Sequence, residues 1–214
     1  MTRPKIIYVY DALCSWCYGF SPVIQAVHDV YSGIFDFEII SGGMMLGEQA
    51  GPISRVFPHI RDSYKRVEEI TGIVFGLPFL KNLEEGEIVF DSETPAIALT
   101  AFKRLQPEKA FEFATHIQNS VYFDGKEPQH MELYRYLAVN YGIDPDEFEK
   151  SMDDPALKEE AHYEFALATQ LRVTSYPAVF LQQNDISYYM IAKGYADYET
   201  MELRIENVRK EIGG

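Results

Sequence analysis

Two cysteines separated by two residues stand where an expected strand passes into an expected helix. Residues 5–10 form a short run of apolar, β-branched and aromatic side chains, which predicts a buried strand. Residues 22–31 carry apolar side chains at helical spacing. Cys14 therefore lies at the start of the helix, and Cys17 lies one turn further along it. Both the fold and the chemistry of the chain must accommodate this junction.

The start of a helix is a favourable place for a reactive thiolate. Its first amide groups have no acceptor within the helix, and they stabilise a negative charge at the helix N-terminus. The thiolate is the nucleophilic form of cysteine, so we expect Cys14 to be the reactive residue. Cys17 can then attack a mixed disulfide at Cys14 within the same molecule. The spacing therefore predicts a dithiol redox site.

Two other interpretations of the cysteine pair remain open. Buried cysteines often act as small apolar side chains. A C-x-x-C motif can also form half of a structural zinc site, which needs four ligands. The chain has two cysteines in total, and its five histidines show no H-x-x-x-H spacing: His28, His59, His116, His130 and His162. We favour the redox interpretation and expect no metal site, because a strand, C-x-x-C and a helix in this order make the motif specific.

Net charge limits the partners of the chain. Its 214 residues include 33 acidic and 19 basic side chains, for a formal net charge of −14. Nucleic acid and anionic lipid both require a basic protein surface, so we expect neither as a partner. No run approaches the ~18 apolar residues of a membrane span, and the apolar run after residues 1–5 is too short for a signal peptide. We therefore expect a cytoplasmic protein, where structural disulfides are rare.

The remaining pattern predicts strands near both ends of the chain and helices between them. Residues 35–40 alternate as a strand, and Gly42 and Gly43 then end it, either as a plain turn or to let another backbone approach a site. Strands return at 178–182 and 186–191, and a last helix covers 198–212. The middle is mainly helical, with helices expected at 53–70, 95–105, 107–121, 129–141, 145–152 and 155–171, caps at Thr94 and Asp144, a kink at Pro58 and a loop over 72–86.

This order of elements, with C-x-x-C at the first helix, resembles the thioredoxin fold, and the helical insertion resembles the DsbA family of that superfamily. Ala12 departs from the family pattern, which usually has proline there. The resemblance implies an α/β fold with a thioredoxin-like domain of residues 1–43 and 172–214 and an all-helical inserted domain of residues 44–171. Three segments carry the resemblance to cytosolic, FrnE-like members: Asp11-x-Leu13-Cys14-Ser15-Trp16-Cys17-Tyr18-Gly19-Phe20-x-Pro22, Ser41-Gly42-Gly43 and Leu171-Arg172-Val173-Thr174-Ser175-Tyr176-Pro177-Ala178-Val179.

The resemblance also implies a binding site for the substrate. Pro177 would be a cis-proline that faces the dithiol, although a trans proline at the start of a strand is common. The backbone of Tyr176 would then pair with an extended substrate segment. The expected substrate-binding residues are Ser15, Trp16, Gly42, Gly43, Tyr176 and Pro177.

The function that the resemblance implies is that of a thiol–disulfide oxidoreductase or isomerase, with Cys14 as nucleophile and Cys17 as resolving thiol. Ser15 and Trp16 stand where strongly oxidising DsbA members carry a histidine, which points to reductase or isomerase behaviour. We expect protein thiols and disulfides or small thiols as partners. We expect no bound cofactor, with glutathione as a candidate co-substrate.

Two alternative functions share this fold. Glutathione-dependent enzymes similar to 2-hydroxychromene-2-carboxylate isomerases and kappa-class transferases act through a single activated group, so the second cysteine, Cys17, favours the dithiol role. Some cytosolic DsbA-like proteins are adaptors that present partners to a protease. In an adaptor the dithiol would be a redox sensor or would have no present role.

Residues 73–80 form an uncharged apolar stretch in the middle region. Two interpretations apply to it: a wall of a substrate groove, or part of the hydrophobic core. We favour the core, because buried apolar runs are the commoner case.

Overall fold

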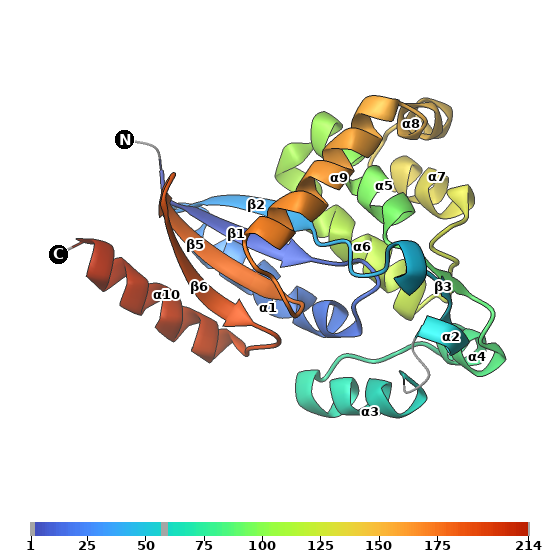
Figure 1. Cartoon of the computed structure of the whole chain (residues 1–214), viewed down its shortest axis with the longest axis horizontal. Coiled ribbons are helices and arrows are strands. Elements are labelled where there is room, and N and C mark those ends of the chain that lie inside the picture. Colours follow the sequence, from blue (N-terminus) through green and yellow to red (C-terminus); the bar gives the residue numbers. More distant parts are fainter. Residues whose placement is uncertain (1–2, 57–59, 214) are drawn as a thin grey trace.

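A four-stranded mixed sheet forms the centre of the computed structural model, which describes residues 3–56 and 60–213. Its strand order is β2-β1-β5-β6. Strands β1 and β2 are parallel, while β5 runs antiparallel to β1 and β6 runs antiparallel to β5 (Figure 1). The strands are β1 (Lys5–Tyr10), β2 (Asp36–Ser41), β5 (Ala178–Asn184) and β6 (Ser187–Lys193).

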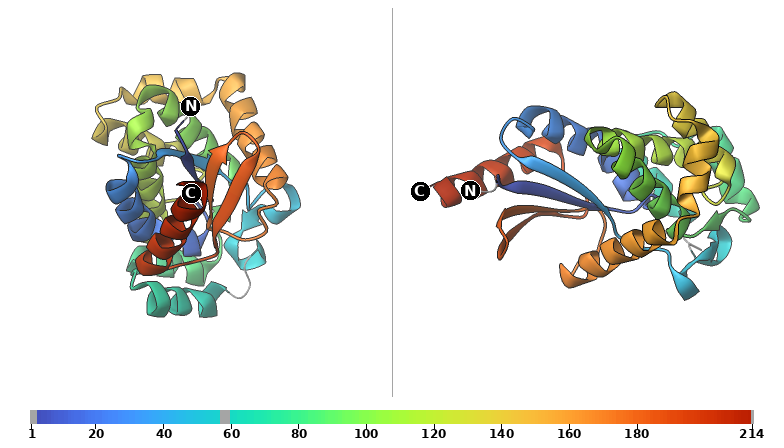
Figure 2. Two further views of the ribbon diagram at one scale, coloured as in Figure 1. Left: turned by 90° about the vertical axis from the view of Figure 1, so that its left-hand side faces the viewer. Right: turned by 90° about the horizontal axis from the view of Figure 1, so that it is seen from above.

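Strand β1 is buried on both faces, which explains its unbroken apolar sequence. Ile6 and Tyr8 face a core shared with α1 (Ser15–Tyr31) and α10 (Tyr198–Gly213). Ile7 and Val9 face the other side, where they belong to a smaller cluster that includes Ala168 of α9. Figure 2 shows α1 and α10 on one side of the sheet and α9 on the other.

The chain between β2 and β5 forms the helical insertion, which lies beyond the carboxyl ends of β1 and β2 (Figure 1). The cysteine motif follows β1 directly, so the insertion lies next to it. The helices are α2 (Ile53–Val56), α3 (Ile60–Thr71), α4 (Leu77–Glu85), α5 (Glu93–Leu105), α6 (Ala110–Tyr122), α7 (Met131–Asn140), α8 (Pro145–Met152) and α9 (Pro155–Gln170). Short 3₁₀ turns cover Gly47–Gln49 and Pro107–Lys109.

Helix α8 shows how local chemistry sets a boundary. The Asp144 side chain accepts hydrogen bonds from the amides of Asp146 and Glu147, at 2.9 and 3.0 Å. Pro145 occupies the first helical position, where its missing N–H has no consequence. The predicted cap and helix bounds are both confirmed here.

The prediction of a loop over residues 72–86 was wrong, because α4 occupies most of that range. Two of the three glycines in this range, together with its proline, belong to the ends of this helix. Pro78 lies in the first turn, Gly76 precedes the helix, and Gly86 ends it with a left-handed φ of 77°. Phe79 and Leu83, four residues apart, form the buried face.

Other parts of the insertion differ from the prediction in smaller ways. The expected helix at 53–70 appears as α2 and α3, and the kink expected at Pro58 lies outside the described residues. The cap predicted at Thr94 was wrong, because helix α5 begins at Glu93 with Ser92 at its N-cap position. Thr94 lies inside the helix, where its hydroxyl donates to Gln129. The insertion is not wholly helical, since β3 (Gly51–Pro52) pairs with β4 (Val89–Phe90). Glycine and proline have low strand propensity, so the sequence gives no strand signal at Gly51–Pro52.

The apolar stretch 73–80 divides between core and surface. Phe75 and Phe79 are buried, whereas Val74 and Leu77 are 60% and 81% exposed. The Phe79 ring lies edge-on to Tyr122, with centroids 5.0 Å apart. The core interpretation therefore holds for the aromatic residues of the stretch. Among the helices that the structure describes, none combines the length and hydropathy needed to cross a membrane.

Candidate active site

Cys14 occupies the N-cap position of α1, as the sequence pattern predicted. Its backbone is extended, with φ −94° and ψ 109°, and its amide closes a turn by donating to the carbonyl of Asp11 at 3.1 Å. The Cys17 amide donates to Cys14 Sγ at 3.2 Å. A helix amide directed at this sulfur stabilises a thiolate there.

The two thiols are free, and they differ in their surroundings. Cys14 is 4% exposed and borders a cavity, whereas Cys17 is completely enclosed. Burial raises the pKa of the Cys17 thiol well above its ordinary value, and the hydrogen bond and charge of Cys14 act in the same direction. Burial therefore favours the protonated form of the Cys17 thiol.

A small cavity of about 180 Å³ brings several expected site residues together. Tyr176 reaches it from the far end of the sequence, and the peptide bond between Tyr176 and Pro177 is cis. The Pro177 carbonyl accepts the Gly194 amide at 2.7 Å, which ties this segment to the end of β6. The cavity is lined by Leu13, Cys14, Ser15, Trp16, Met44, Ser63 and Tyr176.

Gly42 and Gly43 directly precede Met44, which lines this cavity, and side chains occupy the space that their missing Cβ atoms leave. The Tyr176 hydroxyl donates to the Gly42 carbonyl at 2.8 Å. A Cβ on Gly42 would lie 2.1 Å from the Tyr176 ring, and a Cβ on Gly43 would lie 2.7 Å from the Phe165 ring. Gly43 also has a φ of +68°, which suits glycine. The groups that approach closely are therefore aromatic rings, whereas the sequence analysis allowed either a plain turn or the approach of another backbone.

A larger cavity of about 670 Å³ adjoins the first and shares Met44 and Tyr176 with it. Its walls carry one basic and one acidic side chain, Arg55 and Glu48. None of residues 73–80 lines either cavity, so the groove interpretation of that stretch is not supported at the dithiol. The lining residues are Gly43, Met44, Met45, Glu48, Gln49, Arg55, Val56, Val173, Thr174 and Tyr176.

Asp11 is a site residue to which the sequence analysis gave no role. Its carboxylate is buried and accepts hydrogen bonds from the amides of Leu13 and Met44, at 2.9 and 2.7 Å, and from the Ser92 hydroxyl at 3.0 Å. Burial raises the pKa of this carboxyl, and the hydrogen bonds counteract part of that effect. Asp11 thus joins the cysteine turn, the glycine segment and the insertion. A charged residue directly after a buried strand was the available signal.

Metal binding finds no support in the geometry. Within residues 3–56 and 60–213, no three His, Cys, Asp or Glu side chains are close enough together to share an ion. What the site can perform with its own residues is thiol–disulfide exchange. It has one sulfur at a helix start, a second sulfur one turn away, and a cavity next to the first sulfur.

Comparison with known protein families identifies the family of this chain. The profile of the DSBA-like thioredoxin domain matches residues 5–206. The chain belongs to this family. Solved DSBA-like structures show the same fold along the whole chain. A provisionally named protein disulfide isomerase from Nitrosomonas europaea is 24% identical, with a TM-score of 0.84 over 98% of this chain and 99% of that one.

Two further proteins that are similar to this DSBA-like chain have names that indicate two different roles, a disulfide reductase and an adapter protein. The cytosolic disulfide reductase DsbM from Pseudomonas aeruginosa is 24% identical, with a TM-score of 0.78 over 98% of this chain and 100% of that one. A structure of DsbM with GSH is also similar to this chain. The ClpXP adapter protein SpxH from Halalkalibacterium halodurans is 20% identical over 190 residues, which are 85% of this chain. The match spans 60% of the SpxH length.

Proposed function

We propose that this protein is a thiol–disulfide oxidoreductase in which Cys14 is the nucleophile and Cys17 the resolving thiol. The observation that carries the proposal is the asymmetry of the pair. Cys14 Sγ receives an amide hydrogen bond and Cys14 lines a cavity, whereas Cys17 is enclosed and burial raises the pKa of its thiol. The DSBA-like family assignment supports the same chemistry.

The reaction balances with the two thiols alone. The Cys14 thiolate attacks one sulfur of a substrate disulfide, the second substrate sulfur leaves as a thiolate, and a mixed disulfide forms at Cys14. Cys17 then loses its proton and attacks Cys14 Sγ, which releases the first substrate sulfur. The substrate gains two electrons, and the Cys14–Cys17 pair becomes a disulfide. An external thiol reverses that oxidation for the next cycle.

Tyr176 and Pro177 are proposed to dock the substrate beside Cys14. Tyr176 belongs to both cavities, so a substrate next to the dithiol contacts it. The combined space suits an extended peptide segment or a small thiol such as glutathione. We propose protein disulfides as substrates and glutathione as co-substrate, with no bound cofactor.

The direction of the reaction is proposed to be reduction or isomerisation in the cytoplasm. Ser15 and Trp16 are partly exposed at the cavity, and neither adds a positive charge beside Cys14. A thiolate with less stabilisation gives a disulfide that is less oxidising. DsbM, which shares the fold, is named a cytosolic disulfide reductase.

Insulin reduction tests the proposal. Wild type with glutathione as reductant should accelerate the precipitation of insulin chains, and Cys14→Ser should abolish that acceleration. Cys17→Ser should accumulate a mixed disulfide with the substrate, seen as a mass increase on nonreducing gels. If wild type and Cys14→Ser are equally inactive on insulin, the oxidoreductase proposal fails and the adaptor interpretation is the next to test.

A further inference from the structure

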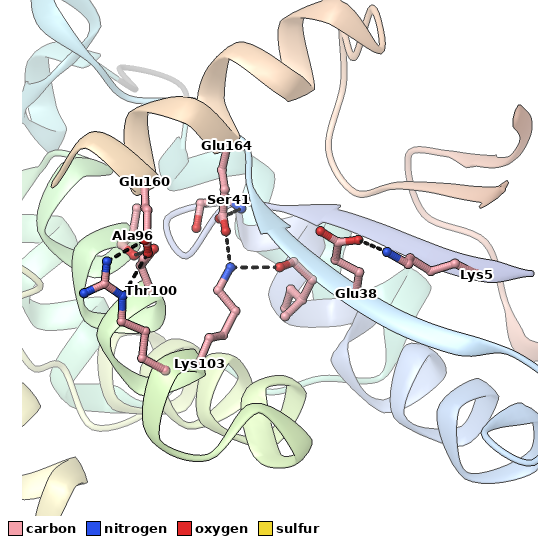
Figure 3. Close-up of polar contacts among 10 residues, drawn as sticks. Lys5, Glu38, Ser41, Ala96, Thr100, Lys103, Glu160 and Glu164 are labelled. Carbon is pink, nitrogen blue, oxygen red and sulfur yellow. Dashed lines mark hydrogen bonds and ion pairs between the residues drawn. The ribbon is translucent and has the colours of Figure 1, made fainter. Parts of the chain in front are cut away.

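The outer edge of β2 is paired by two side chains instead of a strand. Strand β2 lies at the end of the sheet, so its outward N–H and C=O groups lack a neighbouring strand. Lys103 Nζ donates to the Ile39 carbonyl at 3.2 Å, and Glu164 Oε2 accepts the Ser41 amide at 2.8 Å (Figure 3). These two backbone groups, two residues apart, are those that an adjacent strand would use.

The two side chains also pair with each other. Lys103 extends from α5 and Glu164 from α9, and they form an ion pair while both contact β2. Their side chains are 21% and 12% exposed, which excludes most of the solvent. By contrast, the pair Lys5–Glu38 nearer the start of β2 is 37% and 39% exposed. Figure 3 shows both pairs beside β2, with Glu38 on β2 itself and Lys5 on the neighbouring strand β1.

The segment held by Glu164 is the one that supports Tyr176. Ser41 is followed by Gly42, whose amide donates to the Tyr10 carbonyl at 2.7 Å and whose carbonyl accepts the Tyr176 hydroxyl at 2.8 Å. The residue after Glu164, Phe165, packs on Gly43. Helix α9 therefore contacts both ends of the segment 41–43, which leads from the end of β2 to Met44 at the dithiol cavity.

We infer that Lys103 and Glu164 are positioning residues for substrate docking. The charged pair replaces a neighbouring strand, fixes the Ser41–Gly42 backbone, and through it holds the Tyr176 side chain at the wall of the Cys14 cavity. The inference rests on the proposed docking role of Tyr176. Through this pair the helical insertion sets how well an extended substrate binds, without contacting the reacting sulfurs.

Two double variants isolate the hydrogen bond to Ser41. Lys103→Met/Glu164→Gln removes both charges and keeps an amide oxygen for Ser41, whereas Lys103→Met/Glu164→Leu has no acceptor. Neutral replacement of a buried ion pair is usually tolerated by a fold. A lost hydrogen bond changes binding by about five- to tenfold, so we expect that increase in KM for insulin in the Leu variant. The Gln variant keeps the hydrogen bond and should stay within about threefold of wild type.

Control measurements distinguish a loss of substrate docking from a general loss of activity. In both variants the reaction of Cys14 with a small aromatic disulfide should change much less than the KM for insulin, because so small a probe has no extended segment for Tyr176 to position. Glu38→Gln alters the exposed pair on the same strand and should leave both reactions unchanged. Tyr176→Phe removes the hydrogen bond to Gly42 and should raise KM for insulin, and this increase should not add to that of the Leu variant.

Three results would overturn the inference: equal KM in the Gln and Leu variants, equal losses on insulin and on the small disulfide, or an unchanged KM in Tyr176→Phe. An unchanged KM in Tyr176→Phe would overturn the inference even if the Lys103→Met/Glu164→Leu variant does not fold. Wild type that fails to reduce insulin would instead refute the proposed function.

Discussion

Replacement of Phe79 by alanine tests whether the apolar stretch 73–80 belongs to the core. Phe79 has no exposed surface, and its ring lies 5.0 Å from Tyr122 and 5.6 Å from Phe75, between centroids. Leu77 comes two residues earlier on the same helix and is 81% exposed. The two positions share their local sequence and differ in burial, so Leu77→Ala is the matched control.

The expected loss for Phe79→Ala is large. Truncation of a buried phenylalanine costs about 3–5 kcal/mol. Each aromatic pair contributes about 0.5–1.5 kcal/mol beyond burial, which places Phe79 in the upper part of that range, at about 4–5 kcal/mol. For a domain of this length, each kcal/mol lowers the melting temperature by about 2–4 °C, so we expect a fall of about 8–20 °C. Leu77→Ala should change stability by less than about 0.5 kcal/mol.

Thermal melting followed by circular dichroism gives the stability of both variants. The rate of Cys14 with a small aromatic disulfide, measured well below each melting temperature, reports the site and should equal that of wild type. A melting temperature for Phe79→Ala within about 3 °C of wild type would refute the core assignment, since a fully buried ring cannot be removed at so low a cost. A selective loss on protein substrates would then support the groove interpretation.

Three further predictions concern the site. Because burial raises the pKa of Cys17, its contribution to the free energy of unfolding is complete below pH ~8.5 and is lost as pH rises toward the folded-state pKa. Urea titrations of the reduced protein should therefore show a steeper alkaline loss than in Cys17→Ser, and equal slopes would contradict this. Gly42→Ala should displace the neighbouring tyrosine ring and raise KM for insulin about tenfold, whereas Gly33→Ala, with open space around its Cβ, should not. Asp11→Asn should lower the free energy of unfolding by about 1–3 kcal/mol, measured in urea, because one buried amide loses its acceptor; no change would show that the amide is otherwise satisfied.

Local signals in the sequence were sufficient to predict several of the strands and helices. The strand before Cys14, the helix after it and the capped helix at Pro145–Met152 all depend on residues within a few positions of one another. The cysteine spacing likewise predicted the dithiol site, because one helical turn brings Cys17 next to Cys14. The local pattern around α4 was ambiguous, because glycine and proline occur both in loops and at helix ends.

Contacts between distant residues were decided by the tertiary structure alone. Tyr176 and Gly42 are 134 positions apart, and Lys103 and Glu164 are 61 apart. No periodicity or spacing relates such pairs, since their meeting depends on how the sheet edge and the insertion pack. In the sequence, Glu164 looks like one more charge on a polar helix. In the fold it is buried, because the outer edge of β2 needs an acceptor for the Ser41 amide and α9 passes beside it.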